Sequence, residues 1–133
     1  MAFTTFKLTD NHPGYDELHL HHAARKASAY ITVYTLTDKE TKQYIEYCPT
    51  LDVTGYGETV KKAEEMLKSS IDYLLQHLTS LSSKKCSEEL LKLGWKPNKI
   101  KTKDFIKTVV DITNQANEFN ANIESVQRIN VAA

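Results

Sequence analysis

Several features that mark particular classes of protein are missing from this sequence. Its 17 basic residues balance 17 acidic ones, so the chain lacks the positive excess that usually accompanies binding to nucleic acid. It has two cysteines, Cys48 and Cys86, and no Cys-x-x-Cys pair, which argues against a disulfide framework. No apolar run approaches the roughly 20 residues of a membrane span, and the N-terminus lacks a signal-peptide pattern. We therefore expect a cytosolic protein whose free thiols pack in the core.

The composition that remains fits one folded domain. Of 133 residues, 41% are hydrophobic and 26% are charged, close to the average for globular proteins. Residues 1–26 show little periodicity, so we predict an irregular N-terminal arm, or one strand packed on the main sheet. Residues 27–133 are predicted to form a single α+β domain with a C-terminal helical extension.

Three strands are predicted at the start of this domain. Residues 27–36 are rich in β-branched and aromatic side chains, which suit a pleated surface. The polar stretch 37–42 makes a hairpin connection to a second strand, 43–48. Pro49 ends that strand because proline cannot donate to a central ladder. A third, short strand is predicted over 51–56.

A long amphipathic helix gives the strongest signal in the sequence. Apolar residues recur at intervals of three and four, which places them on one helical face. Thr59 is the predicted N-cap. The residues of this face are Val60, Ala63, Leu67, Ile71, Leu74, Leu78 and Leu81.

Further elements are predicted toward the C-terminus. A short helix spans 87–93, capped by Ser87, and a second helical pattern spans 104–120. A last strand runs through Ile129 and Val131. The resulting order, β-β-β-α-α-α-β, predicts an α+β fold with a mainly antiparallel sheet.

The histidines suggest a metal site only weakly. A closed zinc site needs four ligands in a defined geometry, and no cysteine or carboxylate stands at a convincing spacing from them. We therefore expect a solvated, histidine-rich segment with no metal or other cofactor, and a surface position for His77. The histidines near the N-terminus are His12, His19, His21 and His22.

Catalytic motifs are equally weak. Glu46, Asp52 and Glu58 lie near strands and could belong to a magnesium-dependent nuclease, but three scattered acids are ordinary in a chain of this charge content. Cys48 has no neighbouring histidine, and the glycine pair around Tyr56 is too short for a phosphate loop. The sequence therefore favours a binding protein over an enzyme.

Tyrosines point to an interaction surface. Tyr30 and Tyr34 share one strand face, Tyr44 and Tyr47 lie on the next strand, and Tyr56 stands in the glycine turn. Tyrosine combines a large apolar body with a polar tip, which suits interfaces. The alternative interpretation is that part of this set simply covers the sheet.

The run from Tyr44 to Ala63 resembles the HicB-like antitoxin family. The resemblance rests on Tyr47-Cys48-Pro49, on Gly57-Glu58-Thr59 and on Ala63, and it extends over about residues 29–81 and less clearly to Leu93-Gly94-Trp95. It implies a partial ribonuclease H-like fold without catalytic acids, dimerisation, and neutralisation of a small, basic, mRNA-cleaving toxin of the HicA-like kind by direct binding.

The expected partner surface combines tyrosines with acidic groups that complement a basic protein. It comprises Tyr44, Glu46, Tyr47, Asp52, Tyr56 and Glu58. The family's DNA-binding appendage is not evident, because residues 104–133 show no helix-turn-helix pattern, so operator binding is not expected. Two alternatives stay open: a homo-oligomer with another partner, and a residual metal-dependent nuclease.

Overall fold

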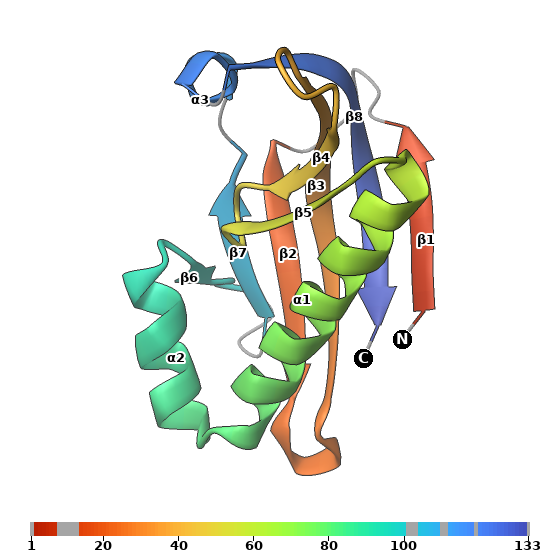
Figure 1. The fold of residues 1–133 in the computed structure, drawn as a ribbon. Helices are drawn as coiled ribbons and strands as arrows, with labels where there is room; N and C mark the ends of the chain where they lie inside the picture. The colour runs from red at the N-terminus through yellow and green to blue at the C-terminus, as the bar shows by residue number, and fades with distance from the viewer. Residues whose placement is uncertain (1, 8–13, 101–103, 110–111, 119, 133) are drawn as a thin grey trace.

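The computed structural model describes residues 2–7, 14–100, 104–109, 112–118 and 120–132. It is an α+β fold built on an eight-stranded sheet (Figure 1), and every strand pairing in the described residues is antiparallel. The strands are β1 (Ala2–Lys7), β2 (Tyr15–His21), β3 (Lys26–Asp38), β4 (Tyr44–Cys48), β5 (Val53–Gly57), β6 (Lys96–Pro97), β7 (Asp104–Thr108) and β8 (Ala121–Ala132).

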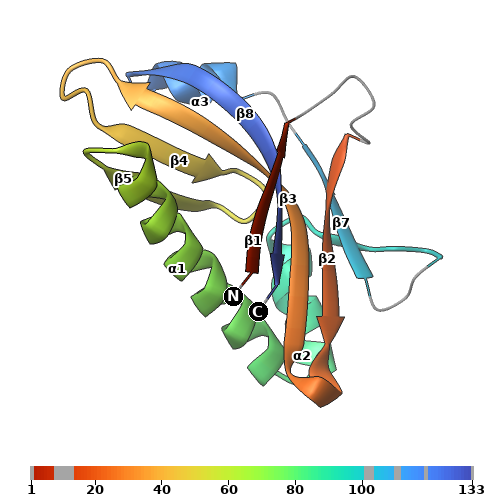
Figure 2. The ribbon, with the colours of Figure 1, turned by 90° about the vertical axis from the view of Figure 1, so that its right-hand side faces the viewer.

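Strand β3 organises the sheet. One of its edges pairs with β8 over residues 28–38. Its other edge is shared, because residues 26–30 pair with β2 and residues 34–37 pair with β4. The sheet therefore forks at Thr32, and the β4–β5 hairpin diverges from β2 and β7 (Figure 2).

Helix α1 (Val60–Ser80) crosses one face of this sheet, over β5, β4 and β3 (Figures 1 and 2). The predicted helix is confirmed, and so is its cap, because Thr59 Oγ1 accepts a hydrogen bond of 3.2 Å from Lys62 N. Its buried face is rotated slightly from the prediction, with Leu75 buried and Val60 exposed. Burying each leucine of this face contributes about 2 kcal/mol.

Helix α2 (Ser83–Lys92) begins four residues before the predicted start. The N-cap is Ser82, whose hydroxyl accepts from Lys85 N at 3.2 Å, and not Ser87. Gly94, at a φ of +91°, ends the turn after the helix. Trp95 is then fully buried, and its Nε1 donates to the carbonyl oxygen of Thr50 at 3.0 Å. This bond ties the end of α2 to the loop after β4.

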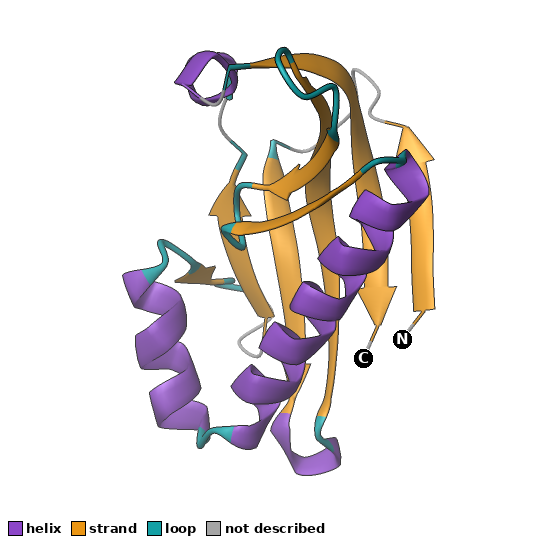
Figure 3. Ribbon diagram, in the orientation of Figure 1, coloured by secondary structure: helices purple, strands orange, loops and turns teal. Residues whose placement is uncertain are grey.

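The predicted helix over 104–120 is wrong for most of its length. Residues 104–108 form β7, which pairs with β2, and only Thr113–Glu118 are helical, as α3 (Figure 3). Phe105 joins the main core, whereas Ile112 and Ala116 pack in a second cluster with Tyr34 and Tyr47. The apolar residues that suggested one helix over 104–120 therefore belong to two separate hydrophobic clusters.

The N-terminal segment is not an irregular arm. Strands β1 and β2 belong to the sheet, and Leu18 and Leu20 of β2 are part of the main core. β1 pairs with β8, which brings the two ends of the chain side by side (Figures 1 and 2). The predicted last strand is confirmed as β8, with Ile129 and Val131 buried.

Candidate functional site

A surface groove lies on the β4–β5 hairpin, on the face away from α1. The hairpin register sets Tyr47 opposite Thr54 and Ile45 opposite Tyr56, so these four side chains share one face. Together with Asp38 and Gln43 they line a groove of about 230 Å³. Tyr47 is 8% exposed and forms the floor, while Tyr56 is 55% exposed and stands at the rim.

Two glycines fix the orientation of this face. A Cβ on Gly55 would lie 2.5 Å from Leu67 N and overlap the carbonyl oxygen of Ala63, so only glycine permits α1 to approach β5 this closely. A Cβ on Gly57 would lie 2.6 Å from the Cβ of Lys62. Because side chains alternate along a strand, Tyr56 between them must point away from α1. The Gly-Tyr-Gly sequence therefore specifies a helix-covered face and an exposed aromatic.

An acidic group stands at one side of the groove. Asp38 Oδ1 accepts hydrogen bonds from Glu40 N at 2.8 Å and Thr41 N at 2.9 Å in the β3–β4 turn. The backbone bonds from Thr41 and Glu40 lower the pKa of Asp38, so its carboxylate is charged at neutral pH. The groove thus combines an aromatic wall with a fixed negative charge.

The six residues predicted to contact a partner do not form one surface. Tyr47 and Tyr56 line the groove, whereas Tyr44 and Glu46 lie on the α1 side of β4, since strand residues alternate. Glu46 is 2% exposed, so it is removed from the partner surface. The buried position of Tyr47 limits its contact to the groove floor.

The other two acids are exposed but serve turns at different places. Asp52 has a φ of +52° in the turn after β4, where its N–H donates to the Pro49 carbonyl at 3.2 Å. Glu58 follows β5 and forms an ion pair of 3.7 Å with Lys62.

Burial has a strong effect on Glu46. Its Oε1 accepts a 2.7 Å hydrogen bond from Thr35 Oγ1 on β3. Burial raises the pKa of Glu46 to about 7, an effect to which the nearby charge of Glu64 adds and which the Thr35 bond opposes. Below about pH 7 the Glu46 side chain is therefore a buried, neutral carboxylic acid.

Four residues of the groove were not predicted from the sequence: Asp38, Gln43, Ile45 and Thr54. A usable signal was present, because the hairpin alternates Ile45 and Tyr47 against Thr54 and Tyr56. The glycines on either side of Tyr56 would have assigned these residues to the face away from the helix. The contributions of Asp38 and Gln43 depend on the geometry of the β3–β4 turn.

The histidines serve separate roles. His19 Nδ1 lies 2.9 Å from Asp104 Oδ2 across the β2–β7 pair. His77 Nε2 on α1 lies 3.2 Å from Glu89 Oε2 on α2, at the surface as predicted. His12 lies outside the described residues. In the described part of the chain, no three His, Cys, Asp or Glu side chains gather as they would around a metal ion.

The carboxyl group of Asp16 is buried where β2 and β4 diverge along one edge of β3. Asp16 is fully buried and accepts hydrogen bonds from Thr32 N at 3.0 Å, Thr32 Oγ1 at 2.8 Å and Thr50 Oγ1 at 2.5 Å. Thr32 sits where β3 exchanges β2 for β4, and its N–H donates to Asp16 at this point of the edge. Asp16 therefore takes the place of a strand carbonyl as acceptor, which is a structural role.

Comparison with protein-family models, with curated proteins and with solved structures found no match. Within the described residues, no helix has the length and apolar character needed to cross a membrane.

Proposed function

We propose that this chain is a protein-binding module that neutralises a small basic toxin of the HicA-like kind, as HicB-like antitoxins do. The observation that carries the proposal is the groove of about 230 Å³ on the β4–β5 hairpin, with Tyr56 exposed at its rim. Exposed aromatics beside a preformed apolar floor are typical of binding hot spots. The resemblance of residues 44–63 supplies the class of partner.

The edge of the hairpin supports the same proposal. In the described residues, β5 pairs with β4 and with no other strand, which leaves its outer edge available for a partner strand. An extended segment added at this edge would place alternate side chains in the groove. The exposed side chains of Thr54 and Tyr56 lie on the groove side of this edge.

The charge around the groove favours a basic partner. Asp38 is the charged residue of its described lining, whereas Asp52 and Glu58 lie outside the lining, in the turns at the two ends of β5. Complementary charge of this kind accelerates encounter and suppresses wrong partners.

We further propose that the protein acts in a reducing cytoplasm as a homodimer. The two free, buried cysteines are consistent with the compartment.

A neutralisation assay tests the proposal. A partner co-purified from the native cells would be assayed for RNA cleavage alone, with the wild-type chain, and with Tyr56→Ala. Tyr73→Ala is the matched control, because Tyr73 is 77% exposed on α1 and lies outside the groove. We expect the wild type and Tyr73→Ala to suppress cleavage and Tyr56→Ala to require at least about tenfold more protein. Equal suppression by both variants would contradict the groove as the binding surface.

The remaining candidates are outcomes of the same experiment. If the only protein recovered is a second copy of this chain, the groove serves an orphan homo-oligomer. Magnesium-dependent cleavage by the chain itself would indicate the nuclease, and Asp52→Asn should then abolish it. Neither result is expected.

A further inference from the structure

A second cavity lies at the other end of β3. It has a volume of about 420 Å³ and is enclosed by the end of β2, the 3₁₀ turn η1 (His22–Ala24) and the first half of α2. Lys26, the first residue of β3, lines this cavity, whereas Asp38, the last, lines the groove. At about 3.3 Å per residue the two sites lie roughly 40 Å apart, so a ligand of one does not contact the other.

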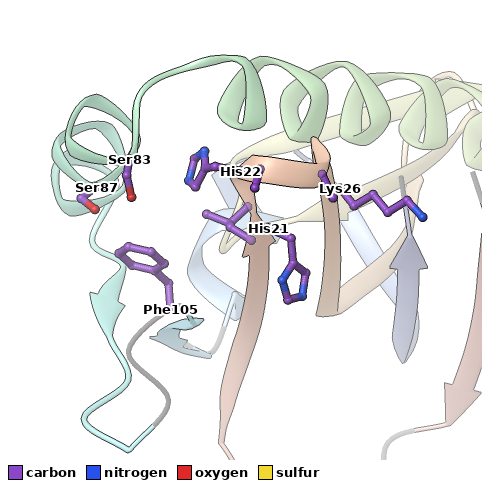
Figure 4. A pocket seen from close by; sticks show the side chains of 9 residues that line it. His21, His22, Lys26, Ser83, Ser87 and Phe105 are labelled. Carbon is purple, nitrogen blue, oxygen red and sulfur yellow. The ribbon is translucent and has the colours of Figure 1, made fainter.

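The walls of this cavity divide into apolar and polar parts. Leu20 and Phe105 supply an apolar surface. Ser83 and Ser87, one turn apart on α2, present their hydroxyls on one helical face. Figure 4 shows His22 extending from η1 toward Ser83, with the ring of Phe105 close to both serines. Neither serine hydroxyl has a hydrogen-bond partner among the described residues.

The imidazole of His22 adds a third hydrogen-bonding group to this wall. Its Nδ1 is buried and has no hydrogen-bond partner in the described part of the structure. A ligand that forms a hydrogen bond with this ring would satisfy a buried polar atom that the described residues leave without a partner. With the hydroxyls of Ser83 and Ser87, the ring places three hydrogen-bonding groups at one end of an apolar pocket.

The residues of the lining indicate which charge a ligand would carry. Among the described residues, His21, His22 and Lys26 are the titratable residues of the lining, and none of the described lining residues is acidic. His21 and Lys26 point away from α2 and lie at the rim (Figure 4). A dianionic phosphate is usually held by charged Arg or Lys donors, which the interior of this cavity does not offer. The hydrogen-bonding groups of Ser83, Ser87 and His22 in an apolar setting suit a single carboxylate.

We propose that this cavity binds a small carboxylic acid with an apolar, ring-sized body. The carboxylate oxygens accept hydrogen bonds from the hydroxyls of Ser83 and Ser87 and from a ring N–H of His22. The apolar body lies against Phe105 and Leu20. A volume of about 420 Å³ falls within the range of small-molecule sites. The proposal is independent of the protein partner at the groove.

Titration of the full-length protein with benzoate, followed by amide NMR shifts, tests the site. We expect saturable shifts at the cavity residues with a dissociation constant at or below about 1 mM. Benzyl alcohol, which lacks the charge, and acetate, which lacks the apolar body, should each bind at least about tenfold more weakly. An absence of saturation by benzoate, or equal binding of acetate, would overturn the proposal.

Paired variants locate the binding. Ser87→Phe fills the cavity and should abolish the benzoate shifts, whereas Ser69→Phe places the same ring on the exposed side of α1 and should leave them unchanged. His22→Ala provides a second measurement if Ser87→Phe does not fold, and it should weaken binding about tenfold by removing a donor. Benzoate binding that persists unchanged in the folded variants would place the ligand elsewhere and refute the assignment.

Discussion

The buried carboxyl of Glu46 makes the stability of this protein depend on pH in a specific direction. In the folded protein its pKa is raised from 4.5 to about 7, mainly by burial beneath α1. Between these two values the unfolded chain ionises while the folded protein keeps its proton. The contribution of Glu46 to the free energy of unfolding should therefore be full below about pH 4.5, fall as pH rises from 4.5 to about 7, and level off above that.

The size of this effect follows from the difference between the two pKa values. Each pKa unit corresponds to about 1.4 kcal/mol, so the difference between 4.5 and about 7 sets a ceiling of about 3.5 kcal/mol. Partial access of water to the ionised group reduces this ceiling, so we expect a loss of about 1–2 kcal/mol in the free energy of unfolding. Glu46→Gln should lack this loss, because the amide does not ionise and its oxygen still accepts from Thr35 Oγ1.

Urea unfolding followed by helical circular dichroism, at about pH 5 and about pH 8, measures the difference. Wild type should lose about 1–2 kcal/mol more than Glu46→Gln between these conditions. Glu58→Gln is the control: the Glu58 side chain is 81% exposed, so this variant should follow the wild type. Parallel pH profiles for wild type and Glu46→Gln would refute the reasoning, because Glu46 would then already be ionised in the folded protein at pH 5.

Three other predictions follow from the fold. Asp16→Ala removes the acceptor of three buried hydrogen bonds from Thr32 and Thr50 and should lower the free energy of unfolding by about 3–5 kcal/mol. A loss below about 1 kcal/mol in urea unfolding would contradict its role at the fork. Gly55→Ala forces α1 away from β5 and should lower the free energy of unfolding by about 2 kcal/mol or more. Thermal unfolding should show this loss as a lower Tm. An unchanged Tm would mean that α1 can move away from β5 without loss of stability. Burial raises the thiol pKa of Cys48 to about 12 and of Cys86 to about 11. Mass spectrometry should therefore detect alkylation of these thiols only after unfolding. Alkylation of the native protein would contradict the buried position of the labelled cysteine.

The elements that sequence analysis predicted well are those with local signals. α1 has a long apolar period of three and four residues and a threonine cap, both of which act within the helix itself. The strands corresponding to β3 and β4 alternate over short runs that end at polar turns or at Pro49. The α+β class with a mainly antiparallel sheet followed from these elements and is confirmed.

The failures involve contacts between distant segments. β7 is a strand because it pairs with β2, and a short apolar run around Phe105 does not distinguish a strand from a helix by period alone. Asp16 is buried because two strands diverge beside Thr32, which no local pattern indicates. Glu46 resembled a surface acid because its burial depends on α1, whose first residue lies 14 positions later in the chain.

The most direct test of the central proposal is quantitative affinity capture from the native cells with wild type, Tyr56→Ala and Tyr73→Ala as baits. Because Tyr56 is an exposed residue, its truncation should leave the Tm nearly unchanged, which separates loss of binding from loss of folding. The account predicts that wild type and Tyr73→Ala retain one small basic protein in stoichiometric amount and that folded Tyr56→Ala loses most of it. Equal retention by Tyr56→Ala, or recovery of no such protein by the wild type, would contradict the account.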